Sequence, residues 1–269
     1  MTLGFTVDTL LPKARGGGQL RMGLVRLEER AWLQPAPDLA ARAAGFADWP
    51  DAVQLTPEVD APGRELAAML GVDGALPEAA LAVHEDLCLL TQAEGEAVYR
   101  LIGAAVAWPS DWHPSEKIGL PLRALHAPIQ GYEEHLATGV DRFMETLRPG
   151  AIYGRCNWFI AACGERRWLP DRPPHEAFAH VTPENAGETL FVRSERQTLR
   201  RLPQTGAILF TIGIYVEPLG RLSPANIAML GRAVQTLVSG EGDRRGAPAY
   251  ADSLIAYALR AACDEGFTG

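Results

Sequence analysis

The sequence predicts an α+β protein in which an antiparallel sheet follows an N-terminal helical wrap and precedes C-terminal helices. Two apolar segments, 85–91 and 97–108, flank a short polar turn, as in a β-hairpin. Further strand-like segments then follow one another between residues 151 and 216, and helical spacing dominates from residue 223 onward. Strands that cluster in this way favour an antiparallel sheet over a doubly wound fold. We expect one domain with a wrap (1–75), a core (76–220) and C-terminal helices (221–269).

The first region is predicted to consist of short helices and loops. Gly16-Gly17-Gly18 and several prolines interrupt it, and 64–70 forms a short helix that ends at Gly71. Next comes the hairpin of 85–91 and 97–108, with its turn at 92–96. Segment 115–126 is expected to be partly helical, with breaks at Gly119 and Pro121.

A longer helix is predicted over 131–147, because its apolar residues recur at intervals of three and four. They are Tyr132, Leu136, Val140, Phe143 and Leu147. Segment 151–161 then reads as a strand with two different faces, since strand side chains alternate. Tyr153, Arg155, Asn157 and Phe159 share one face, and Ile152, Gly154, Cys156, Trp158 and Ile160 share the other.

The remaining elements are a capped helical turn, two strands and two helices. Thr182 is the expected cap, with Pro183 at the first helical position. Strands are predicted over 188–197 and 207–216, with one turn of helix at 198–202 between them. Ser223-Pro224 starts a helix, and a second one spans 249–262.

Composition restricts the function classes. A net charge of −8 argues against a dedicated nucleic-acid surface, which carries a basic excess. The N-terminus lacks the apolar core of a secretory signal, and no apolar run reaches the roughly 18 residues of a membrane span. The four cysteines form no C-x-x-C pair, so we expect reduced thiols in a cytoplasmic protein. Neither the Rossmann fingerprint nor the P-loop is present, so enzymatic chemistry would belong to another bound cofactor.

Three groups of residues are candidates for a functional site. His126 stands at a break before Ala127-Pro128, where an imidazole either caps a helix end or serves as an axial iron ligand. Arg155 and Asn157 put polar groups on a central strand, as a structural ion pair or as part of a site. Glu195, Arg196, Arg200 and Arg201 next to a buried strand form either a salt-bridge network or a grip on a carboxylate or phosphate.

Several strings resemble the motif series of the haem-dependent oxidative N-demethylase family. They are EDLCLL at 85–90, WPSDW at 108–112, EKIG at 116–119, LHAP at 125–128, RCNW at 155–158 and ERQTLRRLP at 195–203. The resemblance covers about residues 22–220, and it implies a PAS-like sheet that carries b-type haem and its iron. It also implies a monooxygenase-type reaction, in which O2 is used to remove a methyl group from a small secondary amine such as dimethylamine and formaldehyde is released.

The resemblance further implies partners and residue roles. Electrons would come from an external partner or from subunits with flavin, iron–sulfur or NADPH-linked chemistry, because this chain lacks the motifs for those centres. His126 is the expected iron ligand, and Arg196, Arg200 or Arg201 would bind the haem propionates. Glu195, Arg155 and Asn157 would line the amine pocket, with Tyr132 as proton donor. Two alternatives stay open, a PAS-like haem or small-ligand sensor without catalysis and a subunit that only acts as a scaffold.

Overall fold

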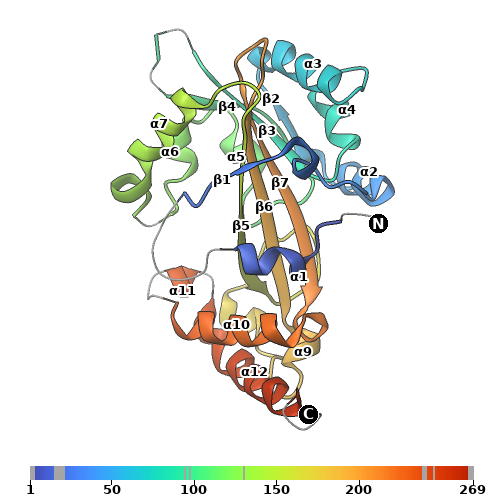
Figure 1. Cartoon of the computed structure of the whole chain (residues 1–269), viewed down its shortest axis with the longest axis vertical. Helices are drawn as coiled ribbons and strands as arrows, with labels where there is room; N and C mark the ends of the chain where they lie inside the picture. Colours follow the sequence, from blue (N-terminus) through green and yellow to red (C-terminus); the bar gives the residue numbers. More distant parts are fainter. Residues whose placement is uncertain are drawn as a thin grey trace.

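A seven-stranded sheet forms the centre of the protein (Figure 1). The computed structural model describes residues 4–14, 22–93, 95–96, 98–129, 131–237, 241–244 and 246–265, so the predicted break at Gly16-Gly17-Gly18 lies outside them. The strand order is β1-β5-β6-β7-β3-β4-β2, and each neighbouring pair is antiparallel. The predicted α+β class with an antiparallel sheet is therefore confirmed. The strands are β1 (Val25–Leu27), β2 (Val53–Leu55), β3 (Asp86–Gln92), β4 (Tyr99–Ala105), β5 (Ile152–Ala161), β6 (Phe191–Arg201) and β7 (Ile208–Pro218).

Helices precede, interrupt and follow the strands. The first group is α1 (Val7–Leu10), η1 (Leu11–Lys13), η2 (Glu29–Ala31), α2 (Leu39–Ala47), η3 (Pro50–Ala52), η4 (Pro57–Val59), α3 (Asp60–Met69) and α4 (Leu76–Leu81). Between β4 and β6 lie α5 (Pro114–Lys117), α6 (Leu122–Leu125), the π-helical turn η5 (Glu133–Ala137), α7 (Thr138–Thr146), α8 (Pro174–Ala177) and α9 (Ala186–Thr189). The last group is η6 (Leu219–Arg221), α10 (Pro224–Gln235), α11 (Glu241–Arg244), η7 (Ala247–Ala249) and α12 (Ala251–Glu265).

Most predicted elements form where the residue patterns placed them. The hairpin predicted from 85–91 and 97–108 forms between β3 and β4, which ends at Ala105, and the 131–147 segment is helical through η5 and α7. The N-terminal region, predicted as helices and loops only, also supplies the two short edge strands β1 and β2. At Thr182, the expected helix starts later, because Thr182 and Asn185 bond to each other's backbone N–H and α9 begins at Ala186.

The predicted helical turn at 198–202 is wrong, because β6 continues straight through it to Arg201. Thr198 pairs with Gly154 on one side and with Thr211 on the other, and Arg200 is paired on both sides in the same way. A helical turn would remove these ladder hydrogen bonds and leave buried backbone groups unpaired. The buried hydroxyls of Thr198 and Thr211, 2.6 Å apart, add a cross-strand bond at the same place.

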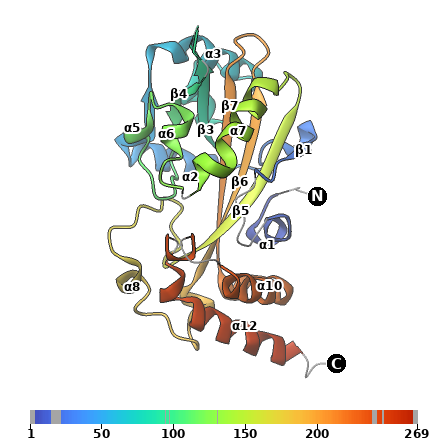
Figure 2. The same cartoon turned by 90° about the vertical axis from the view of Figure 1, so that its left-hand side faces the viewer.

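The sheet has two covered faces, which we call the α7 face and the α3 face (Figures 1 and 2). On the α7 face, Leu199 and Ile208 of the sheet pack with Leu122 of α6 and Met144 of α7. On the α3 face, one apolar cluster joins the sheet to α3 and α4, and another joins it to α1, α10 and α12. Among the described residues, no helix is both long enough and apolar enough to cross a membrane.

Candidate functional site

Four polar side chains of the two neighbouring strands β5 and β6 meet on the α7 face. In the antiparallel register, Arg155 lies opposite Gln197 and Asn157 lies opposite Glu195, so all four project from the same side of the sheet. The prediction that Arg155 and Asn157 share a face with Tyr153 therefore holds. Glu195 and Gln197 are each 8% exposed, so the group is placed in the interior, where polar atoms need partners.

Hydrogen bonds link these side chains into a chain. Arg155 Nε donates to Gln197 Oε1 over 2.7 Å, and Gln197 Nε2 donates to Glu195 Oε2 over 3.0 Å. Asn157 Nδ2 donates to the same carboxylate oxygen over 3.1 Å. Asn157 Oδ1 is buried and has no hydrogen-bond partner. The group therefore offers a carboxylate held by two amides and, next to it, a free acceptor that a ligand N–H would satisfy.

His126 and Tyr132 lie on the helical side of this face as a stacked pair. Their ring centroids are 4.4 Å apart, and the rings are 6° from parallel. His126 Nδ1 lies 2.8 Å from the carbonyl oxygen of Leu122. Because a carbonyl can only accept, this bond assigns the proton to Nδ1 and leaves Nε2 with a free lone pair. Such an imidazole, oriented by a backbone carbonyl, is a suitable metal ligand.

The charge state of the pair follows from burial. Burial lowers the pKa of His126 below its ordinary value, and the Arg155 guanidinium lowers it further, so the imidazole is neutral. Burial also raises the pKa of Tyr132 to about 12, which keeps its hydroxyl protonated. This hydroxyl is buried without a hydrogen-bond partner. The Arg155 guanidinium thus acts to lower the pKa values of both His126 and Tyr132.

The neighbouring strand β7 and two tryptophans give the same face an apolar wall. Ile212 and Ile214 of β7 pack with Trp108, and Trp112 packs both on them and on the cluster under α6 and α7. Since Gln197 pairs with Ile212 and Glu195 with Ile214, the polar chain borders this wall directly. The face is therefore divided into a polar half on β5 and β6 and an apolar half on β7.

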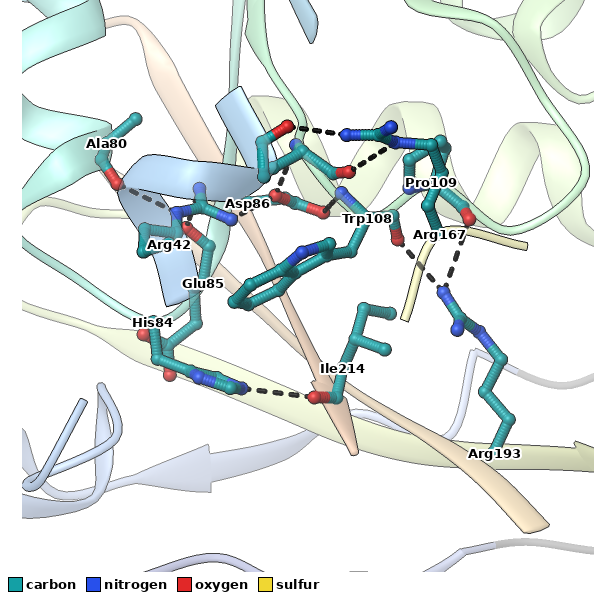
Figure 3. A network of polar contacts seen from close by, with 12 residues as sticks. Arg42, Ala80, His84, Glu85, Asp86, Trp108, Pro109, Arg167, Arg193 and Ile214 are labelled. Carbon is teal, nitrogen blue, oxygen red and sulfur yellow. Dashed lines mark hydrogen bonds and ion pairs between the residues drawn. The ribbon is translucent and has the colours of Figure 1, made fainter. Parts of the chain in front are cut away.

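A buried ionic network fixes the segment that leads from β4 into this region (Figure 3). Asp86 accepts hydrogen bonds from the backbone N–H groups of Ala107 and Trp108 and from Arg42 Nη1, the last at 2.5 Å. Arg42 is fully buried and also binds the carbonyl oxygens of Ala80 and Glu85. From the other side, Arg193 binds the carbonyl oxygens of Trp108 and Pro109, and Arg167 binds that of Ala107.

The three arginines predicted to bind one ligand do not all lie on the same face of the sheet. Arg196 and Arg200 project onto the α3 face, away from Glu195, because they alternate with it along β6. Arg196 Nη1 donates to the carbonyl oxygen of Trp32 over 2.7 Å, and Arg200 Nη1 donates to Glu29 Oε1 over 2.6 Å. Arg201 does lie on the α7 face, where it binds the carbonyl oxygens of Leu147, Met144 and Gly206 and the Tyr99 hydroxyl. Their role as propionate ligands stays a prediction.

Sequence reasoning overlooked Gln197, which joins Arg155 to Glu195. Strand alternation was the signal that could have identified it, since Gln197 follows Glu195 by two residues in a continuous strand. The predicted helical turn just after it obscured that pattern. The buried pair of Arg42 and Asp86 was also missed, because an arginine within an alanine-rich helix reads as exposed.

Comparison with known families gives one finding. A family model described as haem-dependent oxidative N-demethylase, alpha subunit-like, matches residues 57–253. The matched range contains the whole of the polar chain on β5 and β6, the stacked pair of His126 and Tyr132, and strands β3 to β7. Among the described residues, no group of three or more His, Cys, Asp and Glu side chains could hold a metal ion.

Proposed function

The chain belongs to the haem-dependent oxidative N-demethylase, alpha subunit-like family, and we propose that it binds haem b on the α7 face and oxidatively demethylates a small secondary amine. Dimethylamine is the model substrate, and formaldehyde is the product. The observation that supports this most directly is the pairing of a neutral imidazole, which has a free Nε2, with a buried carboxylate and an unsatisfied amide oxygen.

The residues present fit a haem group. His126 Nε2 is available as an axial ligand, and the Leu122 carbonyl fixes the orientation of the ring. The apolar side chains of Trp108, Trp112 and β7 would suit contact with an apolar macrocycle, and the guanidinium of Arg155 lies near enough to His126 to lower its pKa. When bound, haem would supply the activation of O2. The unsatisfied hydroxyl of Tyr132 supports the same fit, because a buried donor of this kind needs a partner.

The protein's own part in the reaction would be to bind and orient the amine. A secondary ammonium ion has two N–H donors, and Glu195 with Asn157 Oδ1 offers two adjacent acceptors. Gln197 and Asn157 hold the carboxylate in place, which reduces the cost of orienting it when the substrate arrives. We propose that Tyr132 holds a proton at its hydroxyl and serves as a hydrogen-bond donor on this face.

Electrons must come from elsewhere, and the words "alpha subunit-like" in the family's description point to a multi-subunit assembly. We propose a partner that carries flavin, iron–sulfur or NADPH-linked chemistry. The second candidate function is a haem or small-ligand sensor, which the same buried site would allow without any reaction. The sheet would then act as a PAS-like sensor module.

An absorption spectrum and a formaldehyde assay distinguish these readings. The reconstituted protein is expected to show a strong Soret band, His126→Ala is expected to lose stoichiometric haem, and the control His135→Ala, an exposed residue on η5, is expected to keep it. With dimethylamine, O2 and a reductant, formaldehyde release supports catalysis, and a haem-loaded but silent protein supports the sensor. Unchanged haem content in His126→Ala would remove His126 from the ligand role.

A further inference from the structure

The α3 face contains a buried carboxyl group, that of Glu85, which accepts a hydrogen bond from a distant segment of the chain. Glu85 is fully buried, and its Oε1 accepts a hydrogen bond from the Gln34 N–H over 2.8 Å. Its Oε2 is buried without a hydrogen-bond partner, and so is the hydroxyl of Tyr215. Both side chains border Gly213, where an added Cβ would meet Glu85 Cγ at 3.5 Å and the Tyr215 hydroxyl at 3.2 Å. A half-satisfied buried carboxyl is costly and so requires an explanation.

The segment that supplies the Gln34 N–H, residues 28–38, crosses this face of the sheet, and we call it the strap. Its carbonyl groups at Ala31 and Trp32 bind Arg196, and Glu29 binds Arg200. Gln34 also accepts a hydrogen bond from the Phe5 N–H through its side chain, over 2.8 Å. The strap is attached through these polar contacts and through Trp32, which is 6% exposed and packs in the apolar cluster under α3 and α4. Two of the polar contacts, at Arg196 and Glu85, lie side by side and carry ionisable groups, so it is the Gln34 end of the strap that depends on a buried carboxyl group.

We propose that the strap is controlled by a proton on Glu85: it lies closed over the sheet while this carboxyl is neutral, and it opens when the carboxyl ionises. The geometry supplies the reason. With the strap closed, water is kept from an oxygen that has no protein donor, so the anion is disfavoured. With the strap lifted, the carboxylate is solvated. Proton binding therefore favours the closed state by linkage.

The other charged groups around Glu85 do not reverse this direction. Burial is the largest effect and raises the pKa of Glu85 to about 7, even though the N–H groups of Gln34 and of Glu85 itself, and then the charges of Arg196 and Arg42, act to lower it. Arg42 is committed to Asp86, and Arg196 to the strap carbonyls. His84 beside it is neutral, since burial lowers its pKa to about 4, and burial together with Glu85 raises the pKa of Tyr215. Among the described residues, Cys156, Arg166, Asp38 and Lys13 are further titratable groups near this cluster.

Residues that hold the strap are also close in sequence to residues of the polar chain on the α7 face. Arg196, which holds the strap, is the chain neighbour of Glu195, and the carbonyl oxygen of Met22, a few residues before the strap, accepts a hydrogen bond from Arg155 over 3.3 Å. Glu195 and Arg155 of the polar chain are thus each next to a group that holds the strap or precedes it in the chain.

Hydrogen exchange of the Gln34 amide tests the proposal, because that N–H is the group bonded to Glu85. After correction for the intrinsic rate, its protection in the wild type is expected to fall by about fifty- to a hundredfold between about pH 5 and pH 8. In Glu85→Gln the protection should be independent of pH. The matched control is Glu65→Gln, because Glu65 is a buried carboxylate with donors on both oxygens, and it should keep the wild-type profile.

A carboxyl NMR titration of Glu85 in the wild type keeps the test decisive if Glu85→Gln fails to fold. The midpoint of the Glu85 titration should coincide with the pH above which the hydrogen-exchange protection of the Gln34 amide falls no further. Flat protection in the wild type, the same slope in Glu85→Gln, or a Glu85 midpoint near 4.5 would each overturn the proposal.

Discussion

Replacing Asp86 with Asn should destabilise the protein strongly, because the change leaves the buried charge of Arg42 without its partner. The side chains of Arg42 and Asp86 are 0% and 1% exposed. Asn keeps the size of Asp, but it removes the negative charge and turns an amide NH2 group toward groups that are themselves donors, Arg42 Nη1 and the N–H groups of Ala107 and Trp108. Breaking one side of such a pair costs about 3–5 kcal/mol.

This loss is a large part of the total, since domains are stable by about 5–15 kcal/mol. Equilibrium unfolding in urea measures it. The matched control is Asp60→Asn, which breaks an ion pair on the surface. The side chain of Arg64 is 66% exposed and that of Asp60 is 60% exposed, and exposed pairs at this helical spacing are worth about 0.3–0.5 kcal/mol. Equal unfolding free energies for the two variants would refute the reasoning. The double change Arg42→Met with Asp86→Leu should recover part of the loss, because no buried charge remains.

Three further predictions concern packing, pH and the site. Gly103→Ala should cost about 1–3 kcal/mol in urea unfolding, because its Cβ would overlap Val59 and lie 2.8 Å from Leu76 Cδ2; Gly139→Ala, whose nearest contact is 3.7 Å away, should be neutral or stabilising. The pKa of Glu85 rises from 4.5 in the unfolded chain to about 7 in the folded protein, so its contribution to stability is fully present below pH 4.5 and falls by about 3 kcal/mol as the pH rises to 7. Glu85→Gln should remove this pH dependence from the unfolding free energy. An unchanged dependence in the variant would contradict the prediction. Gln197→Leu should weaken dimethylammonium binding, measured by spectral titration of the haem-loaded protein, while far-UV circular dichroism stays unchanged.

Local patterns were enough to predict the elements whose partners are close in sequence or whose periodicity is strong. The β3–β4 hairpin and the helix over 131–147 are of this kind. Strand alternation also placed Arg155 and Asn157 on one face before any tertiary information was needed. The three-residue strands β1 and β2 could not be predicted, because each exists only through pairing with a strand far along the chain.

The candidate site was predicted in part. His126, Tyr132, Arg155, Asn157 and Glu195 do lie on one face. The charged residues between Glu195 and Arg201 were, however, predicted to act as one group. The helical turn predicted over 198–202 concealed that this segment is one continuous strand, in which alternate side chains lie on opposite faces of the sheet. Alternation along β6 separates Glu195 and Gln197 from Arg196 and Arg200, whereas the register with β5, which no local pattern encodes, sets Glu195 opposite Asn157 and Gln197 opposite Arg155.

Strand β6 carries the polar chain on the α7 face and the arginines that bind the strap on the α3 face, and this arrangement predicts how the strand would tolerate insertions and deletions. Removing a single residue before Glu195 would shift the strand by one position against β5 and β7, and it would exchange the two sets of side chains between the layers. The same deletion would therefore remove the Glu195 carboxylate from the α7 face and the Arg196 guanidinium from the strap. A two-residue change would preserve which side chains point where, so length variation within this strand should occur in even steps.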